Sequence, residues 1–286
     1  MSPNLQGILW MVLSMAGFAI EDALLKGASS TLPIAQVLVM FGVGGIVLFS
    51  ASIWMTGQSF YVREVRSKPM LIRAVFEVCG RLFYVLAFAL APLSTATVIL
   101  QATPLVVVGA AAVLFGEKVG WRRWAAIIVG LVGVIIIVQP GTDAFSVFMI
   151  FAVLGMLGFA GRDLASRAAP AVLTTSQLGL YGFLALIVAG VIYSGFEQKA
   201  FLWPDPMVAA FMAGAVAFGV IGYAALMRAM RTGEVSAVTP FRYSRLLFGL
   251  FLGVVFFGEA LTPIILSGSA LILASGLFII WRAKST

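Results

Sequence analysis

Histidine is absent from this chain of 286 residues, cysteine occurs once, and charged side chains make up only 10% of it. Without histidine the chain lacks the commonest metal ligand and the usual proton shuttle near neutral pH. The single Cys79 permits neither a disulfide framework nor a cysteine–histidine metal cluster. The shortage of charge also argues against a soluble domain, in which about 25% of residues are charged.

Hydrophobic residues make up 62% of the chain, and they gather in runs long enough to cross a bilayer. A spanning helix needs about 20 mostly apolar residues. We therefore predict an all-α integral membrane protein with ten transmembrane helices. The ten ranges are 5–25, 34–55, 70–91, 95–115, 122–140, 144–166, 176–194, 207–230, 236–257 and 262–281.

The net charge of +7 is explained by the distribution of lysine and arginine among the loops. Cytoplasmic loops of membrane proteins carry an excess of these residues. With the N-terminus inside, the inner loops and helix ends hold Arg63, Arg66, Lys68, Lys118, Arg122, Arg123, Arg162, Arg167, Arg228, Arg231, Arg282 and Lys284, and the outer loops hold Lys26 and Lys199. Both termini are therefore predicted to be cytoplasmic, and no nucleic-acid partner is needed. The start "MSPNLQ" has no basic segment, so the first run is expected to be retained as a span.

The two halves of the chain resemble each other when one is shifted by 142 residues. This shift places Ser94 over Ser236 and Glu117 over Glu259, the latter two within "LFGEKV" and "FFGEAL". We predict two five-helix repeats, residues 1–142 and 143–286. Because five is odd, the second repeat must cross the membrane in the opposite sense, and inverted repeats around a midplane site are typical of secondary transporters.

The segments Ala91–Gly141 and Gly233–Glu259 resemble the EamA-type drug/metabolite transporters, in which each half contains a proline-bearing span that ends in (F/L)GE. Among them the resemblance is greatest to the YddG-type amino-acid exporters of bacterial inner membranes. It implies a helical bundle around a central cavity that exports aromatic or other neutral amino acids and related metabolites. Relatives with the same repeat carry drugs, nucleotide sugars, riboflavin or S-adenosylmethionine, so another metabolite class is the alternative.

The third span carries a polar stripe. Arg73, Glu77 and Arg81 are four residues apart and Tyr84 follows three later, so all four share one helix face. Ionisable groups inside a span cost about 2.5–3.5 kcal/mol each, so they should face protein or water. We predict that Arg81 and Tyr84 line the cavity, with Arg81 able to bind a substrate carboxylate. The other interpretation is an ion ladder in which Glu77 bridges two arginines and Arg73 extends to the interface; Glu77 is a candidate for gating or coupling.

The ninth span contains Arg242 about one turn from its start and Arg245 about two turns in. Arg242 is near enough to the interface to reach lipid headgroups. Gly249 and Gly253 continue the face of Arg245, and glycines at this spacing favour close helix packing. Arg245 is thus predicted to point into the bundle, where it binds substrate, acts in gating or pairs with an acidic residue.

Polar residues near the proline of this span suggest a site that both halves share. Pro240 removes a helix hydrogen bond and is a candidate hinge. Tyr243 is a candidate pocket wall, and in the 142-residue alignment it matches Gln101 of the fourth span. Gln101 shares a face with Thr97 and Pro104, so it either lines the site or satisfies a local backbone carbonyl.

The first and sixth spans supply the remaining candidates. Glu21 and Asp22 are candidates for coupling, although an ion pair between Asp22 and Lys26 is the simpler account of Asp22. In the sixth span, Arg162 and Asp163 are gating candidates, and Phe159 is a candidate aromatic wall of the cavity. The list of expected substrate-binding residues is Arg81, Tyr84, Gln101, Phe159, Tyr243 and Arg245.

No phosphate-binding G-x-x-x-x-G-K-[ST] sequence and no nucleophile elbow occurs, so neither an ATP motor nor a common hydrolase is indicated. We predict a secondary transporter that works by alternating access, without a cofactor or bound metal. Its expected partners are a small-molecule substrate and the lipid bilayer, and a monomer is one option for its assembly. A membrane-embedded enzyme and an accessory membrane subunit are the remaining alternatives.

Overall fold

The computed structural model describes residues 3–114, 120–139, 146–167, 169–170, 172–232 and 239–283, and these residues form helices and no strand. The helices are α1 (Pro3–Ser29), α2 (Ile34–Met55), η1 (Arg63–Arg66), α3 (Lys68–Leu90), α4 (Leu93–Leu100), α5 (Thr103–Leu114), α6 (Trp121–Val138), α7 (Val147–Arg167), α8 (Thr175–Glu197), α9 (Pro206–Arg231), η2 (Thr239–Tyr243), α11 (Ser244–Phe257) and α12 (Pro263–Ala283).

Local sequence signals account for several of the helix ends. Asp205 accepts a hydrogen bond from the backbone N–H of Val208 at 2.9 Å, and Pro206 stands in the first turn of α9, where its missing N–H costs nothing. Thr174 and Gln177 form a reciprocal capping box at the start of α8. Gly258 ends α11 with a φ of +62°, a left-handed conformation that glycine adopts without strain.

Five helices are long and apolar enough to cross a bilayer among the residues that the structure describes: α1, α2, α7, α8 and α9. The stretches Leu93–Val107, Trp124–Val138 and Pro263–Phe278 are shorter apolar helices. The chain is therefore a multi-pass helical membrane protein, and the predicted fold class is confirmed.

Two of the predicted spans are interrupted near their middle or start. The fourth is divided into α4 and α5, with Gln101 and Ala102 between them, and the ninth begins with the 3₁₀ turn η2, which contains Pro240, before α11. Both interruptions lie next to a proline, Pro104 or Pro240, which cannot donate a helical hydrogen bond. When each broken span is counted as one, the described residues form ten helical units.

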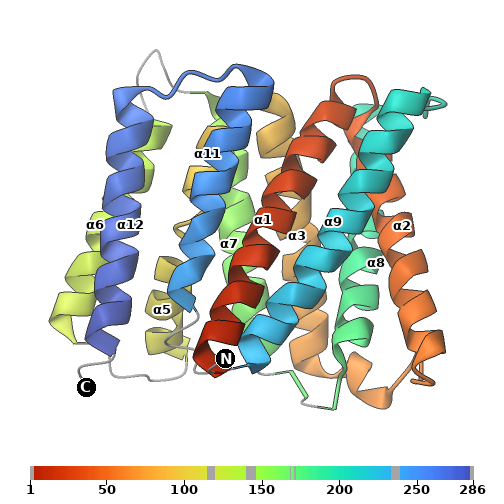
Figure 1. The fold of residues 1–286 in the computed structure, drawn as a ribbon, viewed down its shortest axis with the longest axis horizontal. Coiled ribbons are helices and arrows are strands. Elements are labelled where there is room, and N and C mark those ends of the chain that lie inside the picture. Colours follow the sequence, from red (N-terminus) through yellow and green to blue (C-terminus); the bar gives the residue numbers. More distant parts are fainter. Residues whose placement is uncertain are drawn as a thin grey trace.

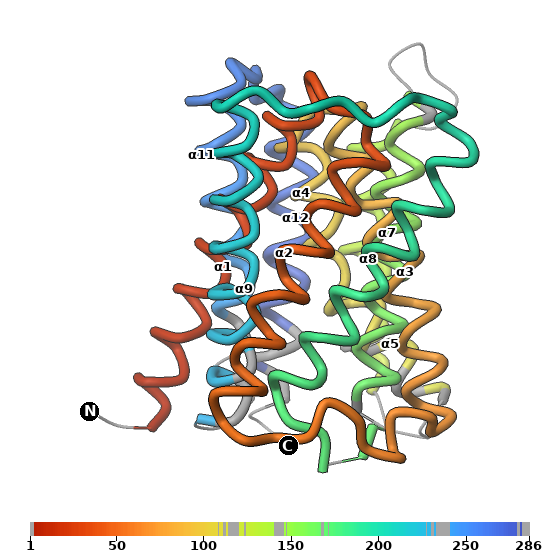
Figure 2. Tube along the Cα trace, turned by 90° about the vertical axis from the view of Figure 1, so that its right-hand side faces the viewer, coloured from red at the N-terminus to blue at the C-terminus, as the bar shows by residue number. Residues whose placement is uncertain are grey.

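Successive units alternate in direction, and the start of α1 and the end of α12 lie at the same end of the bundle (Figure 1). We call this the terminal end and the opposite one the far end. The α6–α12 pair lies at one side of the molecule and the α2–α8 pair at the other (Figure 1). Figure 2 shows that α8 runs beside α2 along the length of the bundle.

The helix pairs are those that two inverted repeats would make. Helices that correspond in the two halves pack directly together in the pairs α2–α8, α4–α11 and α6–α12. The pair α1–α9 has its counterpart in α3–α7. This arrangement agrees with the predicted repeats, while the boundary between residues 142 and 143 falls outside the described residues and stays a prediction.

Glycines allow α3 and α7 to approach closely. A Cβ added to Gly158 of α7 would lie 2.5 Å from both N and Cα of Gly80 in α3, far inside van der Waals contact. Small residues at such crossings let helix backbones meet, as is common in membrane bundles. The contact brings the charged side chains of the two helices within reach of each other.

Candidate functional site

The polar stripe predicted on α3 is buried inside the bundle. Arg73, Glu77, Arg81 and Tyr84 are 4%, 2%, 8% and 1% exposed. Glu77 forms ion pairs with Arg73 at 3.2 Å and with Arg81 at 3.6 Å, which is the ladder that the four-residue spacing allows. Extension of Arg73 to the interface, one of the two interpretations of the sequence, is wrong, because its guanidinium is held inside the protein.

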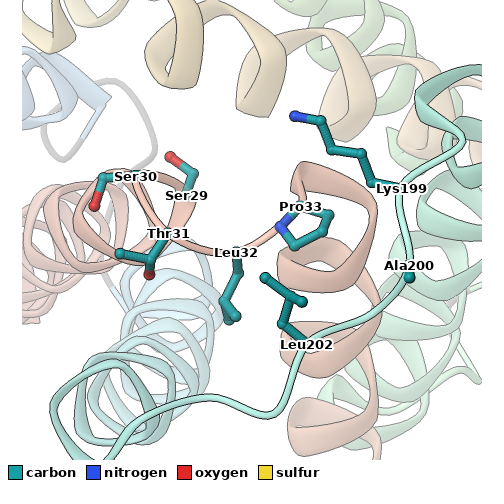
Figure 3. A pocket seen from close by; sticks show the side chains of 8 residues that line it. All are labelled: Ser29, Ser30, Thr31, Leu32, Pro33, Lys199, Ala200 and Leu202. Atoms are coloured by element: carbon teal, nitrogen blue, oxygen red, sulfur yellow. The ribbon is translucent and has the colours of Figure 1, made fainter.

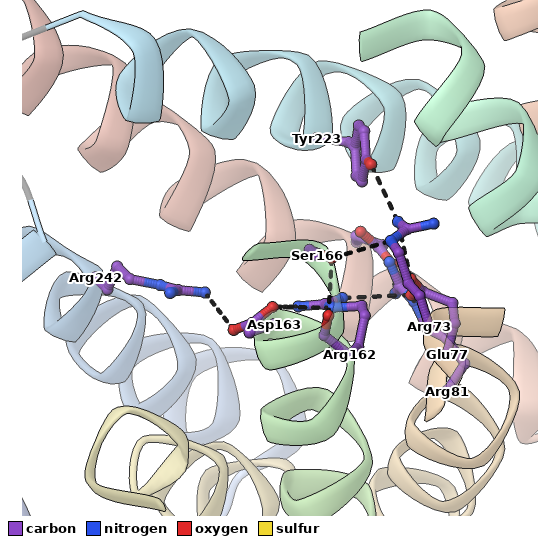
Figure 4. A network of polar contacts seen from close by, with 9 residues as sticks. Arg73, Glu77, Arg81, Arg162, Asp163, Ser166, Tyr223 and Arg242 are labelled. Carbon is purple, nitrogen blue, oxygen red and sulfur yellow. Dashed lines mark hydrogen bonds and ion pairs between the residues drawn. The ribbon is translucent and has the colours of Figure 1, made fainter. Parts of the chain in front are cut away.

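A chain of ion pairs continues from α3 across α7 to η2 (Figure 4). Arg162 contacts Glu77 at 3.3 Å and its neighbour Asp163 at 2.9 Å. Asp163 in turn contacts Arg242 at 3.5 Å. The chain thus joins helices of both halves, and Arg162, which was counted with the loop cations, belongs to the interior.

Arg73 extends the same group of contacts toward α9. Its Nε donates to Ser166 Oγ at 3.1 Å, and its terminal nitrogen donates to Tyr223 Oη at 3.4 Å (Figure 4). Neither Ser166 nor Tyr223 was a candidate from the sequence. We call Arg73, Glu77, Arg162, Asp163 and Arg242 the α3–α7–η2 cluster.

A second cluster joins α1, α3 and α11. Arg245 contacts Asp22 at 2.6 Å, and Tyr84 Oη donates to the same carboxylate at 2.9 Å. Arg81 contacts Glu21 at 3.0 Å. These four residues with Tyr84 form what we call the α1–α3–α11 cluster. The simple pairing of Asp22 with Lys26 is wrong, because Asp22 is 2% exposed and faces α3 and α11 instead.

Aromatic rings cover the guanidinium groups of both clusters. Phe159, which is 6% exposed, lies 4.7 Å from Arg162 and 5.6 Å from Arg81, each measured from the guanidinium carbon to the ring centroid. Tyr84 lies 5.6 Å from Arg245 in the same measure. Such faces attract cations. Phe159 therefore faces the ion pairs rather than lipid, as its predicted place near the cavity requires.

The two symmetry-matched candidates meet at the breaks in their spans. Gln101 Nε2 donates to the backbone oxygens of Arg242 at 3.3 Å and Tyr243 at 3.5 Å. These carbonyls belong to η2, where the helical hydrogen-bond pattern changes. The structure thus brings Gln101 and Tyr243 together, as the repeat alignment predicts, through the backbone rather than through the phenol. Pro240 lies in the same turn.

Close packing of α11 against α4 orients this region. A Cβ on Gly249 would come within 2.5 Å of the Thr97 side chain. The predicted role of this glycine in helix packing is therefore confirmed, and Arg245 on the same side of α11 points into the bundle rather than into lipid.

A further ion pair at the far end was missed. Lys26 Nζ donates to the carbonyl oxygens of Phe88 at 2.9 Å and Ala91 at 2.8 Å, and it contacts Glu259 at 3.6 Å. The Glu259 carboxylate accepts from the backbone N–H groups of Leu93 at 2.7 Å and Ser94 at 2.9 Å. A carboxylate suits the positive start of α4, and a lysine suits the carbonyls that end α3.

This arrangement, which we call the far-end clasp, ties α1, the α3–α4 connection and the end of α11 together. Lys26 therefore lies in a helix contact and not in an outer loop. The repeated "GE" dipeptide was the available signal for Glu259. Its repeat partner, Glu117, lies outside the described residues, as does Ser236.

A pocket of about 350 Å³ opens at the far end between the α1–α2 and α8–α9 connections (Figure 3). Its lining includes Ser29, Thr31, Pro33, Lys199 and Leu202, and no side chain of the two charged clusters. The central cavity predicted from the sequence stays a prediction. Among the described residues no group of histidine, cysteine or carboxylate side chains has the arrangement of a metal site.

These features define a class: a multi-pass helical membrane protein with buried ion pairs between helices of its two halves. Residues 5–139 match the EamA-like transporter family, so the first half of the chain belongs to that family. The predicted resemblance to EamA-type transporters is thereby confirmed.

Relatives align along almost the whole chain. The S-adenosylmethionine uptake transporter of Rickettsia prowazekii is 24% identical over 285 residues, which cover 99% of this chain and 95% of that protein. The pseudopaline exporter CntI of Pseudomonas aeruginosa is 27% identical and covers 94% of each chain. The riboflavin transporter of Rhizobium johnstonii is also 27% identical, with 96% of this chain and 90% of that protein covered.

A solved crystal structure with 19% sequence identity superimposes with a TM-score of 0.62 and covers 96% of both chains, which supports the fold alone. The named relatives are transporters of S-adenosylmethionine, pseudopaline and riboflavin. The finer resemblance, to amino-acid exporters, stays a prediction.

Proposed function

We propose that this protein is a secondary transporter of the bacterial inner membrane, which exports amino acids and related metabolites by alternating access. The observation that carries the proposal is the network of buried ion pairs between the two halves. Asp22 of α1 holds Arg245 of α11, and Glu77 of α3 holds Arg162 of α7. Such pairs are seldom more stable than apolar packing in the same place. Contacts of this kind are useful where helices must exchange partners.

In this proposal the substrate binds beside the α1–α3–α11 cluster and the break in the fourth and ninth spans. The proposed substrate-binding residues are Arg81, Tyr84, Gln101, Phe159, Tyr243 and Arg245. The proposed gating or coupling residues are Glu21, Asp22, Glu77, Arg162, Asp163 and Pro240. Both termini are proposed to face the cytoplasm.

A second candidate is transport of another metabolite class, and the names of the relatives favour it. Those proteins are named for S-adenosylmethionine, pseudopaline and riboflavin. The same clusters would serve either substrate class, since both functions need a polar site between the halves.

Reconstitution of the purified protein in liposomes tests both candidates. The panel contains labelled amino acids, S-adenosylmethionine and riboflavin, and uptake or efflux is followed with and without a solute gradient. We expect saturable flux of at least one class. Arg81→Gln should abolish that flux, while Arg66→Gln should retain it, because Arg66 is exposed in η1 and contacts only the Tyr61 ring among the interactions described.

Saturable flux of amino acids supports the exporter proposal, and flux limited to the other solutes supports the second candidate. A folded, monodisperse protein that moves no solute of the panel would overturn both, and would direct attention to an enzyme or an accessory subunit.

A further inference from the structure

The two charged clusters contain unequal numbers of cations and anions. Their guanidinium groups are Arg73, Arg81, Arg162, Arg242 and Arg245, and their carboxylates are Glu21, Asp22, Glu77 and Asp163. Among the described residues of the clusters there is thus one more positive charge than negative. The far-end clasp does not alter this difference, because Lys26 and Glu259 compensate each other.

The unbalanced charge lies in the α3–α7–η2 cluster. The α1–α3–α11 cluster pairs Arg81 with Glu21 and Arg245 with Asp22, so it is neutral. The other cluster has three arginines and only two carboxylates. Arg81 also contacts Glu77 at 3.6 Å, but assigning it to that carboxylate only enlarges the excess there.

Arg242 is the arginine held most weakly. Its one ion pair, with Asp163, is 3.5 Å long, whereas Arg162 meets the same carboxylate at 2.9 Å. The side chain of Arg242 is also 26% exposed, compared with 4% for Arg73 and 15% for Arg162. It is therefore the cation of the cluster that a solute can reach without first breaking a short ion pair.

The surroundings of Arg242 suit an incoming solute. It lies in η2, at the break of the ninth span, and Gln101 from the fourth span contacts its backbone. Figure 4 shows its guanidinium pointing from η2 toward α7, the helix that carries Asp163 and Arg162. An unbalanced cation inside a membrane protein costs several kcal/mol unless an anion approaches it.

We infer that Arg242 binds an anionic group of the transported solute, such as a carboxylate, and that this contact makes the protein selective for solutes with that group. The inference rests on the proposed transport function and specifies the chemistry of its substrate. A bound carboxylate equalises the charges of the α3–α7–η2 cluster, and guanidinium–carboxylate contacts are among the strongest charge-assisted hydrogen bonds. Arg242 was not among the substrate-binding residues expected from the sequence.

The test compares the transported solute with its own derivatives in the liposome assay. Each carried solute competes against its amide or ester, in which the anionic group is neutral, and the vesicles contain phosphatidylcholine alone so that no anionic headgroup is present. We expect the neutral derivative to compete about 10- to 100-fold less well, the range that a charge-assisted hydrogen bond supplies. Transport of a solute without an anionic group, or equal competition by the neutral derivative, overturns the inference.

Variants separate binding from folding. Arg242→Gln should reduce the preference to nearly onefold, Arg242→Lys should keep part of it, and Arg66→Gln should leave it unchanged, with all three proteins monodisperse. A folded Arg242→Gln protein that retains the full preference contradicts the role of Arg242. Absence of any flux in the wild-type protein overturns the proposed function as well, so the two failures are distinguishable.

Discussion

Replacement of Gly158 by alanine tests whether the α3–α7 contact maintains the charged clusters. The new Cβ would lie 2.5 Å from N and Cα of Gly80, while carbon atoms need about 3.5–4.0 Å. The helices must therefore separate by about 1 Å at this point. Arg162 follows one turn after Gly158, so its 3.3 Å contact with Glu77 would lengthen to about 4.3 Å by the same displacement, which breaks the ion pair.

We expect Gly158→Ala to lower the free energy of unfolding by about 1–3 kcal/mol, the usual cost of overpacking. The measurement is denaturation in mixed micelles, with transport followed in parallel. Gly195→Ala in α8 is the matched control, because nothing lies within 4 Å of its added Cβ, and it should gain up to about 1 kcal/mol from helix propensity. Equal stability of the two variants would refute the reasoning.

Two further predictions concern the ion pairs. Asp22→Asn leaves Arg245 without its 2.6 Å carboxylate, so unfolding should become about 3–5 kcal/mol easier, and adding Arg245→Gln should recover part of the loss in a double-mutant cycle; strictly additive effects would contradict the pairing. Glu259→Gln removes the negative charge at the start of α4, so a cysteine replacing the fully buried Ser94 should react faster with a water-soluble thiol reagent in a Cys79→Ser background; an unchanged labelling rate would show that the far-end clasp does not close this end.

Features that depend on local sequence were predicted well. The range predicted for the second span, 34–55, coincides with α2, because Pro33 and the apolar run define it. The shared face of Arg73, Glu77 and Arg81 follows from helical periodicity, and all three are buried together. The insertion cost of charged groups likewise predicted that Arg81 and Arg245 avoid lipid.

The partners of these residues could not be predicted, since they come from distant parts of the chain. Arg81 and Glu21 are 60 residues apart, and Arg245 and Asp22 are 223 apart. Helical spacing favoured Lys26 as the partner of Asp22, whereas the packing of α1 against α11 places Glu259 beside Lys26. Only the arrangement of the helices decides between such alternatives.

The correspondence of α1–α9 with α3–α7 has a consequence for energetics. If each half adopts the shape of the other, contacts surrendered on one side reappear on the opposite side between equivalent helices. The two resulting conformers then bury similar surfaces and differ little in free energy, so the modest binding energy of a metabolite is enough to bias the population from one to the other.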